Sequence, residues 1–342
     1  MTQPAFRRVL VLTGDHRLPD TTKRDNAYHE EDFETHRAMR AALESLPGYS
    51  FEFLDDHGCF LDRFRSDPPE FVLNFCDTGF RNVSFLELNI PAYLELLGVP
   101  YSGATPQAMV IAYDKALVRL AAQAAGVPVP AETYLRPDDS LHLLPDRYPA
   151  LIKPSHADGS VGITKDAVVR NRREALAYIA FLRDLLPDRA ALVQEYLPGP
   201  EYGMGLVGNP GTGLFALPPL EVDFSALPAG LAPILSFESK TEPDSPYWTD
   251  IRFRKADLAD EEREAMEAHA RTMFSRIGLK DYGRFDFRRG ADGVIKLMEV
   301  NPNPAWANDG KFAFMAGFAG HDYPAMLNLI LEAAQARLAD GC

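Results

Sequence analysis

The stretch Arg284–Pro304, RFDFRRGADGVIKLMEVNPNP, has the pattern of a β-hairpin whose strands carry polar side chains at alternate positions. These side chains are Arg284, Asp286 and Arg288 before the turn, and Glu299, Asn301 and Asn303 after it. Side chains two residues apart on a strand face the same side of the sheet. If RGADG forms the turn, the two sets meet across the ladder. The hairpin therefore predicts that Asp286, Glu299 and Asn301 point the same way.

The composition is that of a folded chain with room for two or three packed units, since 342 residues exceed the size of one typical core. The formal charge, from 35 Lys and Arg against 49 Asp and Glu, is −14, which argues against non-specific binding to nucleic acid or to anionic membranes. The segment RRVLVLTGD offers four consecutive apolar residues, too few for a signal peptide or a membrane span. It predicts a first buried strand.

The three cysteines, Cys59, Cys76 and Cys342, lack the spacing of a metal site and are too few for a disulfide framework. Reduced thiols and a cytoplasmic location are expected.

Strand and helix patterns alternate over the first hundred residues, which indicates an α/β unit with a mostly parallel sheet and helices on both faces. Strands are predicted at 7–12, 49–56 and 68–77, with helices at 29–46 and within 84–103. Further on, helices are predicted at 109–125, 171–186, 259–278 and 323–338, and strands near 132–136, 148–154, 189–210 and 217–224. Residues 239–250, SKTEPDSPYWTD, are predicted to form an exposed loop.

Two motifs point to other chemistry but fit it poorly. GMGLVG, Gly203–Gly208, matches the dinucleotide fingerprint of a Rossmann-type dehydrogenase, yet a turn follows it where the fingerprint needs a helix. We favour a glycine-bearing strand there. HEEDFETH, His29–His36, has neither zincin nor calcium-loop spacing and predicts a solvated helix start. P-loop and nucleophile-elbow patterns are absent from the sequence.

The stretch IKPSHADGSVG is a better candidate for anion binding. Lys153 ends an apolar strand, and the following loop carries Gly159, Ser160 and Gly162. A point charge beside small residues suits phosphate oxygens, because backbone N–H groups can approach the anion closely. A lysine whose stem covers apolar surface before an ordinary turn is the alternative.

Taken with YDKALV around Lys115, VQEYLPGPEY and the opening hairpin, this stretch resembles the ATP-grasp superfamily, and within it the D-alanine:D-alanine ligase group. VLNFCD, YLELLGVPYSG and AAGVPVP strengthen the resemblance, which covers nearly the whole chain. It implies an α/β (α+β) ATP-grasp architecture with a parallel-sheet domain at 1–104, a central lid subdomain with a linking helix at 105–198, and a catalytic domain at 199–342. ATP would lie between two antiparallel sheets.

The resemblance also implies a ligand for the hairpin. Asp286, Glu299 and Asn301 would bind two Mg²⁺ ions, with Mn²⁺ as a substitute, because Mg²⁺ prefers oxygen ligands and shares phosphate oxygens. The other implied residues are Lys115, Lys153 and Lys240 for the phosphates, Gln194, Glu195, Tyr196 and Leu197 as the adenine-binding hinge, Glu201 for the ribose, and Arg284 with the N–H groups of Gly159 and Ser160 for the oxyanion.

The implied reaction is ATP-dependent amide formation between a small-molecule carboxylate and an amine through an acyl phosphate. Water must be excluded while the acyl phosphate exists, and the glycine loop with residues 239–250 would supply the lids.

The alanine-binding half departs from the family. The Gly-Gly-x-Ser-x-Glu turn gives way to TGDHRLPDTTKRDNAYHEEDFE, in which Glu30 or Glu31 is the candidate replacement for the ammonium-binding Glu. CDTGFRN and NPAWANDGKFAFMAG replace two further alanine-contacting segments. We therefore expect an amino-acid ligase of specialised biosynthesis with other substrates. Lys311 is a candidate partner for an acidic group and Trp306 for lining its pocket; a solvated charge and a core residue are the alternatives.

Two rival functions stay open. A cell-wall D-alanine:D-alanine ligase would turn over D-alanine alone, and a non-catalytic nucleotide-binding protein would bind ATP without releasing phosphate. A homodimer is expected from the resemblance, and neither nucleic acid nor a membrane is an expected partner.

Overall fold

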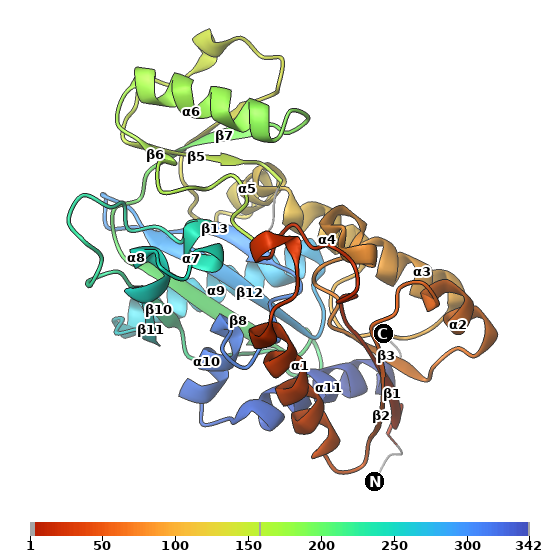
Figure 1. Ribbon diagram of the computed structural model, residues 1–342. Coiled ribbons are helices and arrows are strands. Elements are labelled where there is room, and N and C mark those ends of the chain that lie inside the picture. The colour runs from red at the N-terminus through yellow and green to blue at the C-terminus, as the bar shows by residue number, and fades with distance from the viewer. Residues whose placement is uncertain (1–3, 157–158, 341–342) are drawn as a thin grey trace.

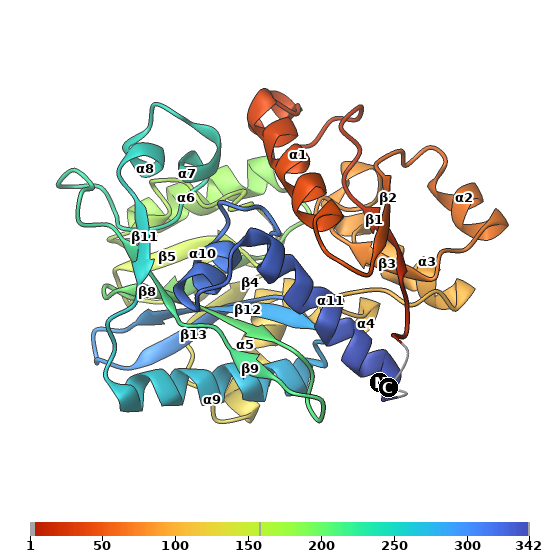
Figure 2. The same ribbon diagram turned by 90° about the horizontal axis from the view of Figure 1, so that it is seen from below.

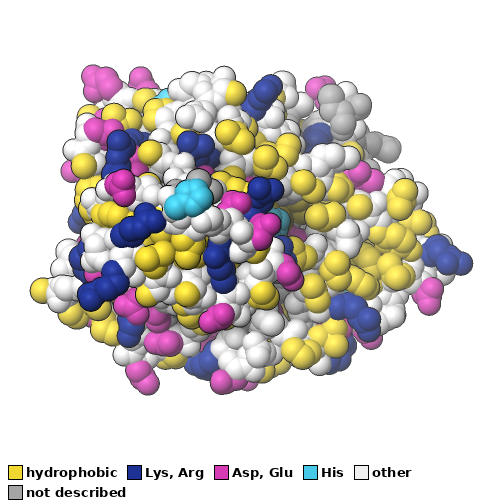
Figure 3. Space-filling model, turned by 90° about the horizontal axis from the view of Figure 1, so that it is seen from above, with side chains coloured by type: hydrophobic (Ala, Val, Ile, Leu, Met, Phe, Trp, Pro, Cys, Tyr) yellow, Lys and Arg dark blue, Asp and Glu magenta, His cyan; other side chains and the backbone are white. Residues whose placement is uncertain are grey.

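The computed structural model describes residues 4–156 and 159–340, and this part of the chain contains three β-sheets (Figure 1). Cys59 is a free exposed thiol and Cys76 a free buried one, whereas Cys342 lies outside the described residues. No helix in the described ranges is long and apolar enough to cross a membrane. Acidic and basic side chains are interspersed on the face seen in Figure 3.

The first sheet is parallel, as predicted, with the strand order β2 (Ser50–Leu54), β1 (Arg8–Leu12), β3 (Phe71–Asn74). Its helices are α1 (Glu30–Glu44), α2 (Phe60–Ser66) and α3 (Asn89–Leu97). Val9 and Val11 belong to one apolar cluster and Leu10 and Leu12 to another, so both faces of the sheet are covered. The sequence pattern missed α2. Short 3-10 helices occur at η1 (Arg24–Asn26), η2 (Phe80–Asn82), η3 (Ser84–Leu86) and η4 (Leu141–Leu143).

The second sheet is antiparallel, with the order β4 (Glu132–Leu135), β7 (Ala191–Glu195), β5 (Ala150–Pro154), β6 (Val168–Val169). One helix, α6 (Arg172–Leu185), packs on it through Ile179 and Leu182. The side chain of Asn171 accepts a hydrogen bond from the Glu174 N–H and so caps the start of α6.

The third sheet is antiparallel, with the order β11 (Arg252–Lys255), β10 (Leu220–Asp223), β8 (Glu201–Val207), β12 (Tyr282–Arg289), β13 (Ile295–Asn301); β9 (Phe215–Ala216) also pairs with β8. Its two faces carry different helices (Figure 2). These are α4 (Pro106–Tyr113), α5 (Lys115–Ala124) and α9 (Asp260–Ile277) on one face, and α10 (Lys311–Phe318) and α11 (Tyr323–Ala339) on the other.

GMGLVG lies in β8 and the turn after it, as favoured over a dinucleotide loop. A Cβ at Gly205 would lie 3.0 Å from Phe312 and 3.3 Å from Met315, so the absence of a side chain there lets α10 approach the sheet.

Two sequence predictions were wrong in detail. The helix predicted at 109–125 is two helices, because Asp114 has an extended backbone and starts α5 instead of continuing α4. The segment 239–250 is not a simple exposed loop: it follows the start of α7 (Glu238–Thr241) and contains α8 (Pro246–Thr249), and Tyr247 is 2% exposed. The helix α10 and the strand β11 were also missed.

Candidate active site

A cavity of about 530 Å³ is lined by both antiparallel sheets. It is lined by every residue predicted to bind the nucleotide or metal or to stabilise the oxyanion: Lys115, Lys153, Gly159, Ser160, Gln194, Glu195, Tyr196, Leu197, Glu201, Lys240, Arg284, Asp286, Glu299 and Asn301. These side chains come from segments up to 186 residues apart in sequence, between Lys115 and Asn301, and the fold alone brings them together.

The hairpin β12–β13 brings its polar side chains together through an irregular register. Asp286 pairs with Glu299 and Arg284 with Asn301, whereas Phe287 pairs with Leu297, which leaves Met298 as an extra residue in a β-bulge. A bulge reverses the side to which the following residues point. Leu297 therefore packs into the core while Glu299 and Asn301 line the cavity. Asn303 lies beyond the strand, and its Nδ2 donates to Glu87 Oε1 at 2.9 Å.

Each carboxylate of the hairpin that lines the cavity lies beside a cationic side chain. Arg284 donates from Nε to Asp286 Oδ1 at 2.9 Å and from Nη2 to Oδ2 at 3.0 Å. Burial raises the pKa of Asp286, but Arg284 and Lys311 outweigh burial and lower the pKa to about 2. Lys115 Nζ lies 3.2 Å from Glu299 Oε1, and that lysine is the main cause of the lowered pKa of Glu299 once the opposing effect of burial is counted. Both carboxylates are therefore ionised at neutral pH.

This donor set fits a magnesium site that shares phosphate oxygens. Two ionised carboxylates face each other, and the amide of Asn301 lies 3.3 Å from Asp286 Oδ2, so it can turn its oxygen to the same point. No group of three or more His, Cys, Asp or Glu side chains with metal-binding geometry occurs among the described residues. Mg²⁺ commonly takes one or two carboxylates and completes its shell with water and phosphate.

Two buried lysines supply positive charge to the cavity. Asp114 Oδ1 accepts hydrogen bonds from the N–H groups of Ala116 and Leu117 at 2.9 and 3.1 Å, which starts α5 with Lys115 as its first residue. Lys153 is 4% exposed and forms no ion pair within the described ranges. Burial, and then the charge of Lys115, lowers the pKa of Lys153. A buried ammonium without a partner is well suited to an anionic ligand.

The opposite end of the cavity is more apolar, with Leu151, Leu197 and Ile234 in its wall. Gln194 Nε2 donates to Glu132 Oε2 at 2.9 Å, and the carboxylate of Glu195 accepts from Lys296 Nζ at 3.0 Å. These side chains are thus held by neighbours, and the backbone of the 194–197 segment is left to face a ligand.

Arg288 was given no role by the sequence pattern, although its alternation placed it on the cavity face. It donates to the carbonyls of Gly199 and Pro233 at 3.1 and 2.6 Å, and its Nη1 lies 3.4 Å from Glu201 Oε2. Arg288 therefore fixes Glu201 at the cavity wall.

The glycine loop and the residues after it are hydrogen-bonded to residues 235–238, which lead directly into the second predicted lid segment, 239–250. Ser160 Oγ donates to the Leu235 carbonyl at 3.2 Å, and the Phe237 N–H donates to the Ile163 carbonyl at 2.8 Å. The carboxylate of Glu238 accepts from the Lys165 N–H at 3.0 and 3.2 Å. The glycine loop and the segment leading into α7 thus form one cover over the cavity.

Two of the four predicted substrate residues, Glu31 and Trp306, line a second cavity described below, whereas Glu30 and Lys311 do not. Glu30 lines neither this cavity nor the second one, and its Oε1 lies 2.6 Å from Arg37 Nη2. Glu31 Oε1 lies 3.4 Å from Arg24 Nη2. Trp306 is 7% exposed, stacks on Phe75 and donates its indole N–H to the Phe75 carbonyl, which fits the core alternative.

Lys311 lies at the nucleotide end rather than with Trp306. Its Nζ is 3.5 Å from Glu201 Oε1 and 3.7 Å from Asp286 Oδ2. The lysine therefore sits between the predicted ribose and metal ligands, and the structure does not bring it together with Trp306 in one cavity.

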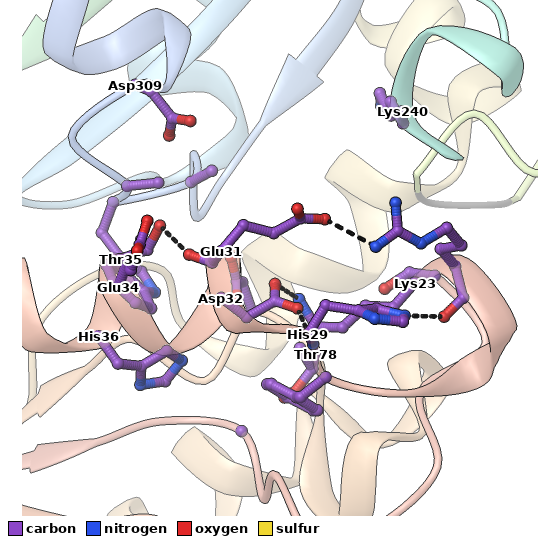
Figure 4. A pocket seen from close by; sticks show the side chains of 18 of the residues that line it. Lys23, His29, Glu31, Asp32, Glu34, Thr35, His36, Thr78, Lys240 and Asp309 are labelled. Carbon is purple, nitrogen blue, oxygen red and sulfur yellow. Dashed lines mark hydrogen bonds and ion pairs between the residues drawn. The ribbon is translucent and has the colours of Figure 1, made fainter. Parts of the chain in front are cut away.

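A second cavity of about 670 Å³ adjoins the first, and α1 together with the loop before it forms much of its wall (Figure 4). The two cavities share Lys240, Trp248, Ala305 and Asp309. Trp306 and Glu31 line this second cavity. Much of its wall comes from the segments in which the sequence departs from the family pattern, and these segments supplied both substrate candidates.

Residues 132–332 match the family described as D-ala D-ala ligase C-terminus. A D-alanine:D-alanine ligase of Desulfotalea psychrophila is 30% identical over 71% of this chain and 72% of its own length. The vancomycin/teicoplanin A-type resistance protein VanA of Enterococcus faecium is 28% identical over 78% of this chain and 75% of its own.

Among solved structures, the D-alanine:D-alanine ligase of Bacillus anthracis, complexed with ATP, superposes with a TM-score of 0.71. The alignment covers 98% of this chain and 100% of that one at 18% identity. The arrangement of one parallel and two antiparallel sheets is thus the fold of that enzyme.

Proposed function

The chain belongs to the D-alanine:D-alanine ligase family and is an ATP-dependent ligase, and we propose that it joins a small carboxylate to an amine through an acyl phosphate, with substrates other than two alanines. The observation that supports the mechanism is the single cavity in which Lys115, Lys153, Arg284 and the three oxygen ligands of the hairpin converge. The proposal assigns these residues the roles that the sequence resemblance implied.

In the first step, the substrate carboxylate attacks the γ-phosphorus of ATP and the bond to the β-phosphate oxygen breaks, which yields an acyl phosphate and ADP. Lys115 and Lys153 hold the phosphate oxygens and offset their charge. Mg²⁺ bound by Asp286, Glu299 and Asn301 would supply further charge neutralisation when present. Lys311 and Lys240, which both lower the pKa of Asp286, add positive charge at the same end.

In the second step, the amine attacks the acyl carbon, phosphate leaves and the amine proton passes to solvent. Arg284 and the N–H groups of Gly159 and Ser160 stabilise the tetrahedral oxyanion. The hydrogen-bonded lids keep water from the acyl phosphate meanwhile.

A change of substrate is supported by the second cavity. Its walls come from the segments that replace the alanine-binding motifs, and a volume of about 670 Å³ lies in the range of sites for ligands much larger than alanine. The sequence relatives favour the rival function, a cell-wall D-alanine:D-alanine ligase, because several of them are D-alanine:D-alanine ligases. Turnover with D-alanine alone would favour that rival.

The test is phosphate and ADP release from ATP and Mg²⁺ over an array of amino acids and small acids, singly and in pairs, with products identified by mass. Release only with pairs other than two alanines, together with an amide mass, is the expected result. A D-alanine dipeptide would favour the cell-wall activity instead. ATP binding with no ADP from any pair would contradict catalysis and favour a nucleotide-binding protein.

A further inference from the structure

The second cavity is polarised, and its charge distribution indicates what it binds. Figure 4 shows Lys240 and Lys23 on one side of the cavity, and Glu34 and Asp309 on the other. Asp309 reaches from the loop before α10 toward the part of α1 that carries Glu34 and Thr35. Two carboxylates carried by different elements thus approach the same end of the space.

Most charges around the two cavities are already paired. In the second cavity, Asp32 pairs with Lys23 at 2.6 Å and Glu31 with Arg24 at 3.4 Å, while Asp77 has an interaction of its own. In the nucleotide cavity, each of the other carboxylates has a cationic partner: Glu195 with Lys296, Glu201 with Arg288, Asp286 with Arg284, and Glu299 with Lys115.

Glu34 and Asp309 are the exceptions, since neither has an ion pair with any residue in the described ranges. Nearby His36 adds little positive charge, because burial lowers its pKa. Two carboxylates without a cationic partner among the described residues therefore line one end of the cavity.

The position of Asp309 connects this end to the chemistry. Asp309 lines both cavities and lies two residues before Lys311, which contacts the predicted metal ligand Asp286. A molecule in the second cavity that places its carboxylate toward Lys240 and the nucleotide would extend its other end toward Asp309 and Glu34. A cationic group at that end would meet two carboxylates that have no cationic partner among the described residues.

We infer that the second cavity binds a substrate that carries a cationic group, such as a basic amino acid or an amine-bearing derivative of one, with that group between Glu34 and Asp309. The inference rests on the proposed ligase function for the identity of the site, and it adds the chemical class of one substrate. Glu34 and Asp309 are then specificity residues that contact the substrate.

The test uses the tryptophans as reporters, because the chain has 2 and both Trp248 and Trp306 line the second cavity. Fluorescence is titrated with arginine and lysine, and with their neutral analogues citrulline and norleucine, in the presence of Mg²⁺ and a non-hydrolysable ATP analogue. Both D and L forms are used. The cationic member of a pair is expected to bind about tenfold tighter or more, as for a hydrogen-bonded charge.

The variants Glu34→Gln and Asp309→Asn are each expected to reduce this preference about tenfold. Glu34 does not line the nucleotide cavity, so Glu34→Gln is also expected to leave the affinity for the ATP analogue unchanged. Glu30→Gln is the matched control, because Glu30 is one turn away on α1, outside the cavity and paired with Arg37. Equal binding of cationic and neutral probes, no saturable response to any probe, or equal losses for both classes in the variants would overturn the inference.

The ADP assay separates this result from the ligase proposal. If neutral or acidic pairs give ADP and an amide while cationic ones do not, the ligase function stands and the inference is overturned. If arginine or lysine binds through both carboxylates but no pair yields ADP, the binding inference stands and the proposed reaction is overturned.

Discussion

At the scale of single residues, the cavity holds the carboxylates of Asp286 and Glu299 in the ionised state before any ligand arrives. Both carboxylate oxygens of Asp286 accept hydrogen bonds from Arg284, which lies two residues earlier on the same strand. Burial raises the pKa of this carboxyl group, and the pairing with Arg284 lowers it. Lys153 is in the reverse situation, because burial and Lys115 lower its pKa and no carboxylate pairs with it. An incoming triphosphate would complete that balance.

Replacing Glu299 by Gln tests the proposed metal site. The rate of ADP formation is expected to fall about a hundredfold, because one ionised ligand is lost where charge develops. The Mg²⁺ concentration for half-maximal rate should rise as well. Asp292→Asn, in the exposed turn of the same hairpin, serves as the control. A fully active Glu299→Gln enzyme would contradict the metal assignment.

Lys280 predicts a pH dependence of stability. Burial, and then Arg337, lowers the pKa of Lys280 from 10.5 to about 8 in the folded state. Between about pH 8 and pH 10.5 the unfolded chain binds more protons at this lysine than the folded chain does. The free energy of unfolding therefore increases as the pH rises, by up to about 1.4 kcal/mol per pH unit, and below about pH 8 the contribution of Lys280 is constant.

Urea unfolding of the wild type and of Lys280→Met across pH 7 to 10 measures this contribution. The variant is expected to gain less stability with rising pH, and Lys255→Met on exposed β11 should behave as the wild type does. Identical slopes for wild type and Lys280→Met would show that the folded-state shift is absent.

At the scale of elements, two irregularities in the backbone position three side chains of the proposed site, Lys115, Glu299 and Asn301. The bulge at Met298 moves Glu299 and Asn301 to the cavity side of β13 although Leu297 faces the core. The break at Asp114 starts a new helix, so that Lys115 stands at its first turn rather than in the middle of a longer helix. Regular continuation of either element would point these side chains elsewhere.

Replacing Asp114 by Ala should weaken both the helix start and the nucleotide site. Loss of the cap is expected to cost about 1 kcal/mol of unfolding free energy. The KM for ATP should rise several-fold because Lys115 loses its fixed position. Asp114→Asn retains a capping oxygen and should restore both values, as measured by denaturation and steady-state kinetics. An Asp114→Ala enzyme with unchanged KM would show that the cap does not position Lys115.

At the scale of the whole molecule, loops from different parts of the chain contact one another around the site. Asn303 bonds to Glu87, the ring of His156 stacks on Phe85 at 4.9 Å between centroids, and a Cβ at Gly159 would lie 3.5 Å from Thr22. We propose the units 1–104, 105–198 and 199–342 as domains, with α4 and α5 packed on the sheet of the third. The cover over the cavity therefore depends on residues from all three proposed units.

Uncoupling the lids should expose the acyl phosphate to water. In Glu238→Ala, the two hydrogen bonds to the Lys165 N–H are lost, and phosphate release per amide formed is expected to rise above one, with a several-fold lower rate of amide formation. Parallel phosphate and product assays measure the ratio. Glu242→Ala, four residues on and exposed, is the control. A ratio of one in the Glu238→Ala variant would assign water exclusion to other segments.

The sequence by itself determined the alternating strands and the hairpin, because period-two alternation is a local property. The residues expected to bind the nucleotide were named from the family resemblance, since their convergence in one cavity is not a local property. It did not predict the bulge at Met298 or the helix α10. The break at Asp114 was also missed, although its cause is local, because the Asp114 side chain accepts hydrogen bonds from the N–H groups of Ala116 and Leu117.

Only the tertiary structure decided the substrate side. It placed Glu30 outside the cavity, engaged Trp306 with Phe75, put Lys311 between Glu201 and Asp286, and left Asp309 at the junction of two cavities. The physical reason is that ion pairing and burial depend on which distant charges the fold brings together, and spacing along the chain does not carry that information.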